Sequence, residues 1–176
     1  MRNYRGFQVL SKGRKLHDEV KSSLEDRVRE ELHAMRTYMC QASFFMSIGC
    51  SKLANKMWAE AQEEMKHAMM LLDRLHMFGG HPEVGEVPDV PESHAVKEAL
   101  DHQQRMEEDA IEKYNKLAKI ARVHGDHETA RIAEKILKDE EEHWDWVDGE
   151  IDKIRNMGIQ NYLAEQSEHD DEKAWR

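Results

Sequence analysis

Four long stretches of the sequence carry an apolar residue every three or four positions, and each apolar stripe contains one glutamate. This spacing is typical of amphipathic α-helices whose apolar faces pack into a shared core. The glutamates lie well inside their stripes, at Glu31, Glu64, Glu107 and Glu140. Because a buried, uncompensated carboxylate is costly by several kcal/mol, four of them in one core indicate a bound cation.

The spacing of these glutamates repeats along the chain. In each half, 33 residues separate the first glutamate from the second, and a histidine, His67 or His143, follows the second glutamate by three positions. Side chains three positions apart project to one side of a helix, so each Glu-x-x-His motif can grip one metal ion. Two similar hairpins facing each other predict a site with local two-fold symmetry.

The helical patterns cover about residues 17–48, 51–78, 93–124 and 127–156, and a short apolar segment follows at 159–163. Short turns make each pair of helices antiparallel, and a stretch that holds all three prolines, 81–92, crosses between the pairs. The predicted fold class is an all-α, antiparallel four-helix bundle with one long crossover. We expect an N-terminal extension at 1–16, the bundle at 17–164 and an acidic polar tail at 165–176.

Charge and composition exclude several classes of protein. The net charge of −10 argues against a general nucleic-acid binder. No apolar run approaches the roughly 20 residues that span a bilayer, and the basic first 15 residues lack the apolar stretch of a secretory signal. Two cysteines make no disulfide framework, so the cytoplasm is the expected compartment. We expect Cys40 to be buried and Cys50 to be an exposed thiol.

Four carboxylates and two imidazoles are a hard, oxygen-rich ligand set, which suits two Fe or Mn ions better than thiolate-bound zinc or copper. Glu64 and Glu140, beside the histidines, are the natural bridges between the ions. The other two glutamates are expected as terminal ligands, each with one histidine: Glu31 with His67, and Glu107 with His143. Four negative charges then balance two divalent cations. A metal-free bundle with polar core layers is the alternative, disfavoured because unpaired buried carboxylates are costly.

Tyr38 follows Glu31 by seven residues, or two helical turns, on the same stripe. Its phenol can act as a one-electron donor near the metals, or it can be a hydrogen-bonding core residue. Both interpretations stay open from the sequence.

At these positions the sequence resembles bacterioferritin. The matching stretches are Glu30-Glu31-Leu32 with Tyr38, Glu64-Met65-Lys66-His67, Glu107 with Asp109, and 138–143 running into Asp145-Trp146. Residues 156–163 are similar to the family's short fifth helix. The resemblance implies a ferritin-like fold, ferroxidase activity with dioxygen or hydrogen peroxide, and ferric mineral stored in a hollow shell assembled through dimers. The fifth helix favours 24 subunits, and the atypical chain ends leave 12 open.

The resemblance also implies an iron porphyrin, either haem b or iron-coproporphyrin, held between two subunits by one methionine from each. Met65 matches that position and is expected to point away from the bundle core. It belongs to a second apolar stripe, typical of a subunit interface: Trp58, Met65, Met69 and Leu72. Arg36 and Lys66 are candidate partners of the propionates. Ordinary interface packing of Met65 is the alternative.

Two other functions remain open. The first is a rubrerythrin-like di-iron peroxidase without mineral storage, although the rubredoxin-like Cys-x-x-Cys pair usual in that family is absent from this sequence. The second is a small protective or haem-carrying ferritin shell whose di-metal site is structural. Mini-ferritins that protect DNA usually build the iron site between subunits, whereas here one chain supplies the whole ligand set.

Overall fold

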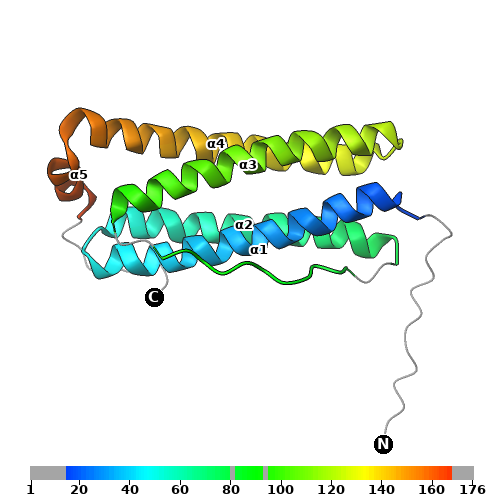
Figure 1. Cartoon of the computed structure of the whole chain (residues 1–176), viewed down its shortest axis with the longest axis horizontal. Coiled ribbons are helices and arrows are strands. Elements are labelled where there is room, and N and C mark those ends of the chain that lie inside the picture. The colour runs from blue at the N-terminus through cyan, green and yellow to red at the C-terminus, as the bar shows by residue number, and fades with distance from the viewer. Residues whose placement is uncertain (1–14, 80–81, 93–94, 168–176) are drawn as a thin grey trace, which may run out of the picture.

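The computed structural model describes residues 15–79, 82–92 and 95–167, and in these ranges the chain is helical without strands. The helices are α1 (Asp18–Ser47), α2 (Ser51–Met77), α3 (Val96–Val123), α4 (His127–Met157) and α5 (Ile159–Gln166). Figure 1 shows α1 beside α2 as one antiparallel hairpin and α3 beside α4 as the other, with α5 at one end. The predicted helical bundle with a short C-terminal helix is confirmed, although α3 begins three residues later than expected.

The crossover between α2 and α3 runs along the α1–α2 hairpin, as Figure 1 shows. Side chains of α1 hold its backbone. Arg29 Nε donates to Val84 O at 2.6 Å, and Arg36 Nη1 donates to Pro88 O at 3.2 Å. The long connection is therefore fastened to the outside of α1, and its residues 82–92 are half-buried or exposed, with Val84 packed against the edge of a core cluster.

The buried apolar side chains form two clusters, one toward each end of the bundle. One cluster includes Phe45, Met57 and Val147, and the other includes Leu24 and Leu71. On each of the four long helices, the glutamate of the apolar stripe falls between the residues of the two clusters. The apolar clusters thus enclose a polar layer near the middle of the bundle.

The α5 helix covers one end of the bundle through Tyr162. This side chain is fully buried, and its hydroxyl donates to Glu150 Oε2 on α4 at 2.6 Å. Cys50, which precedes α2, packs in the same cluster and is 3% exposed, whereas Cys40 lies on the surface. The expectation for the two cysteines was therefore wrong. Burial raises the pKa of the Cys50 thiol.

Residues 1–14 and 168–176 lie outside the described part of the chain, so the division into an extension at 1–16, a bundle at 17–164 and a tail at 165–176 stays a prediction. In the described ranges, none of the helices combines the length and the apolar character that a bilayer span requires.

The turn between α3 and α4 is tied to the first hairpin through Asp126. Its carboxylate caps α4 by accepting from Thr129 N at 3.1 Å, and it also accepts from Arg74 Nη2 of α2 at 2.5 Å. Burial alone would raise the pKa of Asp126, but the hydrogen bonds from Thr129 and Arg74 outweigh it and lower that pKa. Arg74 is only 8% exposed, so the Asp126 carboxylate stabilises a guanidinium charge that has little contact with water.

We expect Asp126→Ala to reduce the free energy of unfolding by about 2–4 kcal/mol, because it removes a helix cap and leaves a buried guanidinium without its carboxylate. Asp126→Asn is the matched variant. It keeps the cap and loses the charge pair, so its loss should be smaller. Urea unfolding measures both, and equal losses for the two variants would contradict a separate contribution from the cap.

Candidate metal centre

All six side chains expected to ligate metal converge in the polar layer between the two apolar clusters. The four long helices contribute them as follows: Glu31 from α1, Glu64 and His67 from α2, Glu107 from α3, and Glu140 and His143 from α4. None is more than 5% exposed. One subunit therefore supplies the complete set.

The two glutamates of the Glu-x-x-His motifs lie between the two histidines. His67 Nδ1 is 3.1 Å from Glu64 Oε2 and 3.3 Å from Glu140 Oε1. His143 Nδ1 is 3.6 Å from Glu64 Oε1 and 3.5 Å from Glu140 Oε2. Each of these carboxylates thus turns one oxygen toward each histidine, which is the disposition of a ligand that bridges two ions.

The donor atoms form two groups in which one atom from every residue lies within 4.8 Å of the others. The first group is Glu31, Glu64, His67 and Glu140, and the second is Glu64, Glu107, Glu140 and His143. The groups share the two central glutamates and differ in the terminal glutamate and the histidine. Two metal ions can therefore sit side by side, each with one terminal carboxylate and one imidazole.

The far nitrogen of each histidine meets a carboxylate on the opposite hairpin, and the sequence analysis missed both. His67 Nε2 is 3.3 Å from Asp139 Oδ2, and His143 Nε2 is 2.6 Å from Glu60 Oε2. Such partners fix the orientation of a ligating imidazole and leave its other nitrogen for the metal. The available signal was position: Asp139 precedes a ligand, and Glu60 lies one turn before another.

Two tyrosines hold the terminal glutamates across the hairpins. The Tyr38 hydroxyl of α1 donates to Glu107 Oε1 of α3, and the Tyr114 hydroxyl of α3 donates to Glu31 Oε1 of α1. Both phenols are buried. Tyr114 was missed as a site residue, although it follows Glu107 by the same seven residues that separate Tyr38 from Glu31. The local two-fold symmetry therefore extends to the tyrosines.

The ligand atoms of this layer fit a metal because several have no partner of their own. Four buried atoms of the predicted ligands accept or donate no hydrogen bond: Glu31 Oε2, Glu64 Oε1, Glu140 Oε1 and His143 Nδ1. Buried polar atoms are normally paired. Unpaired oxygen and imidazole nitrogen atoms at this spacing are the donor set that divalent iron or manganese accepts.

Without metal, protons must relieve the repulsion among the carboxylates. Burial and neighbouring carboxylates raise the pKa of Glu31 and Glu107 well above the usual range. Burial would lower the pKa of His67 and His143, but contacts with the glutamates outweigh it and raise these pKa values to about 12 and about 11. Burial opposes ionisation of Glu64, but the nearby imidazoles of His143 and His67 outweigh it and lower its pKa to about 2.

A cavity of about 420 Å³ lies against this layer between α1 and α3. Its lining includes buried ligands such as Glu31 and Glu107 as well as more exposed residues such as Glu30 and Asp109. At that outer part, Lys113 Nζ donates to Glu30 Oε1 at 2.5 Å and also binds Asp109. Small ions and molecules can therefore approach the centre past a rim of charged side chains.

The residues expected around a porphyrin lie on the surface and not in this centre. Met65 is 49% exposed and Met69 is 53% exposed, and both belong to α2. Lys66 is exposed as well, whereas Arg36 donates to backbone carbonyls of the crossover. The Met65 thioether is thus available to a group outside the subunit.

Comparisons with known proteins match this architecture. A family model described as a ferritin-like domain matches residues 21–157. Bacterioferritin of Streptomyces coelicolor is 31% identical over 146 residues, covering 83% of this chain and 87% of the relative. Bacterioferritin of Brucella melitensis is 30% identical over 139 residues, covering 79% and 86%. A bacterial ferritin of Synechocystis is 26% identical over 148 residues, covering 84% and 95%.

A four-helix bundle with a buried layer of four glutamates and two histidines, together with these matches, defines the class. The chain belongs to the ferritin-like family. Among the members of that family it is similar to bacterioferritins, as the sequence motifs predicted.

We expect the affinity of this centre for Co²⁺ to rise with pH between 6 and 8. A metal must displace protons from the histidines and from the glutamates whose pKa is raised, and lower pH strengthens that competition. Each proton released per ion makes binding about tenfold weaker per pH unit of acidification. Calorimetry on the parent protein and Glu140→Ala isolates the centre, and a pH-independent affinity would contradict the account.

Proposed function

We propose that the protein is an iron-storage ferroxidase. It oxidises Fe(II) to Fe(III) with dioxygen or hydrogen peroxide and stores the ferric product as mineral inside a hollow homo-oligomeric shell. The observation that carries this proposal is the buried set of six ligands in one subunit, in which Glu64 and Glu140 each turn one oxygen toward each histidine. Similarity to bacterioferritins over most of the chain supports iron as the metal.

In this proposal each half of the centre holds one iron ion. Glu31 and His67 bind one ion, Glu107 and His143 bind the other, and Glu64 and Glu140 bridge them. Two Fe(II) ions supply two electrons to the oxidant, so oxidation need not release a one-electron product. The chain's own contribution is to orient the ligands: Asp139 and Glu60 hold the far nitrogens of the histidines.

The cavity between α1 and α3 is the proposed path by which Fe(II) and the oxidant reach the centre. Its lining joins the buried ligands to Glu30 and Asp109. These two carboxylates attract a divalent cation, and Lys113, which bonds both of them, limits the local negative charge.

The chain is proposed to assemble through dimers into a shell, with 24 subunits favoured over 12. The exposed methionines of α2 support an interface on that face. Both cysteines are free, which fits a reducing compartment, and we propose the cytoplasm. Membrane and nucleic acid are not among the proposed partners.

The direct test of the oxidation site is Glu140→Ala. Loss of a bridging ligand should slow the rapid phase of Fe(II) oxidation at least about 100-fold, since even partners of ligands change activity by tenfold or more. Stopped-flow absorbance in air measures it. The matched control is Glu141→Ala, which removes an exposed neighbouring carboxylate and should leave the rate unchanged. Parent-like oxidation by Glu140→Ala would refute the proposed site.

Storage is tested separately by the amount of iron that stays in solution with the protein. We propose that it greatly exceeds the two ions per chain that the centre holds. Rapid oxidation with no iron retained beyond that amount would replace the storage proposal by the rubrerythrin-like di-iron peroxidase.

Tyr38 and Tyr114 are proposed as positioning residues for the terminal glutamates. Tyr38→Phe and Tyr114→Phe each remove a buried hydrogen bond to a carboxyl group, and bonds to charged groups contribute about 1.5–3 kcal/mol. We expect Co²⁺ binding to weaken about tenfold or more in each variant. Tyr162→Phe, which removes a buried bond at the end of the bundle, is the control and should leave Co²⁺ affinity unchanged. Unaltered affinity in both site variants would contradict this role.

Met65 is proposed as an axial ligand of an iron porphyrin shared between two subunits, and Lys66 and Arg36 as partners of its propionates. The half-exposed thioether on an apolar part of α2 fits such a ligand, and the porphyrin would supply an electron-transfer group. Met65→Leu should abolish the sharp Soret band of the purified protein. Met69→Leu, one turn away and equally exposed, should retain it. A Soret band that survives in Met65→Leu assigns Met65 to packing.

A further inference from the structure

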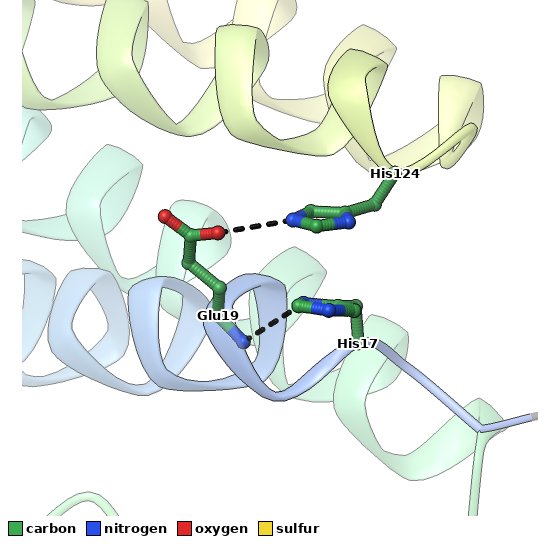
Figure 2. A group of neighbouring side chains, drawn as sticks. All are labelled: His17, Glu19 and His124. Atoms are coloured by element: carbon green, nitrogen blue, oxygen red, sulfur yellow. Dashed lines mark hydrogen bonds and ion pairs between the residues drawn. The ribbon is translucent and has the colours of Figure 1, made fainter.

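Two histidines and a glutamate meet at the end of the bundle where α1 begins and α3 ends. Figure 2 shows the rings of His17 and His124 lying face to face with Glu19 beside them. The ring centroids are 3.5 Å apart and the planes differ by 12°. His124 Nε2 is 3.0 Å from Glu19 Oε2, and the three residues place one donor atom each within 4.8 Å of one another. We propose that they form a binding site for a divalent transition-metal ion such as Zn²⁺.

The ligand chemistry favours such an ion. Two imidazoles and one carboxylate are a common protein set for zinc, with the remaining coordination position left to water. Two ligands of one Zn²⁺ ion at about 2.1 Å and a tetrahedral angle lie about 3.4 Å apart. The observed 3.0 Å between His124 Nε2 and Glu19 Oε2 is close to that separation. An ion can therefore replace this hydrogen bond with a small movement of the two side chains.

The local structure also brings the donors together. His17 is the N-cap of α1, and the electron pair of its Nδ1 accepts from Glu19 N at 3.3 Å, so a metal ion bound at this nitrogen would replace the cap hydrogen bond. Among the ion pairs of the described residues, Glu19 has His124 as its partner and no lysine or arginine.

The site is separate from the six-ligand centre. Glu19 precedes Glu31 by 12 residues on α1, which is about 18 Å along a helix. Its ligands come from both hairpins, because His17 and Glu19 belong to the start of α1 and His124 is the C-cap of α3. A bound ion would thus link the two hairpins at this end of the bundle. The inference does not depend on iron oxidation.

The test compares Zn²⁺ binding to the assembled full-length protein and three variants by calorimetry. His124→Ala removes one ligand, and Glu19→Gln removes the charge of another with little change of shape. His127→Ala is the matched control, because this exposed histidine belongs to the same turn and lies outside the cluster. Any Zn²⁺ bound by the six-ligand centre is a background common to all four proteins.

We expect the parent protein and His127→Ala to bind one more Zn²⁺ ion per chain than His124→Ala, and Glu19→Gln to bind that ion at least tenfold more weakly. Zn²⁺ should also slow amide hydrogen exchange in the first turn of α1 and around residues 120–126 of the parent protein. In His124→Ala, Zn²⁺ should leave exchange at these positions unchanged. Equal stoichiometry and affinity in the parent and both ligand variants would overturn the site. Because Glu19→Gln is a conservative change, it decides the question if His124→Ala does not fold.

Discussion

Four carboxylates in one layer of a helical core are the constraint on which the rest of this structure depends. Their mutual repulsion and lost hydration would open the bundle if nothing compensated them. In the absence of metal, two histidines, two tyrosine hydroxyls and bound protons compensate the carboxylates. The raised pKa values of Glu31 and Glu107 reflect the burial and carboxylate repulsion that remain. Apolar clusters lie on both sides of the layer, and a metal ion that enters it can replace the protons.

The two hairpins depend on each other because their polar contacts cross. Tyr38 of the first hairpin donates a hydrogen bond to Glu107 of the second, and Tyr114 of the second hairpin donates one to Glu31 of the first. The far nitrogens of the histidines cross in the same way, to Asp139 and to Glu60. The positions of the ligands therefore depend on how the two hairpins pack together, and metal binding is linked to the stability of the whole bundle.

Periodicity predicted the fold and the four buried glutamates, because each glutamate lies on the apolar stripe of its own helix. The Glu-x-x-His spacing added His67 and His143 to the same layer. A seven-residue repeat after Glu107 would have found Tyr114 as well. The positions of Glu60 and Asp139 near the predicted ligands were visible in the sequence, but their pairing with His143 and His67 depends on which helix faces which. Cys50 is buried because α5 docks over it, and Arg36 is engaged because the crossover passes beside it. His17 and His124 are far apart in the sequence and meet only through the packing of the hairpins.

The central claim is that this layer holds two metal ions between Glu64 and Glu140. Anomalous diffraction at the iron edge, from crystals soaked anaerobically with Fe(II), measures it most directly. The account predicts two peaks per chain about 3.5–4 Å apart, each next to one histidine and one terminal glutamate. A single peak, or ordered carboxylates with no peak among them, would contradict it.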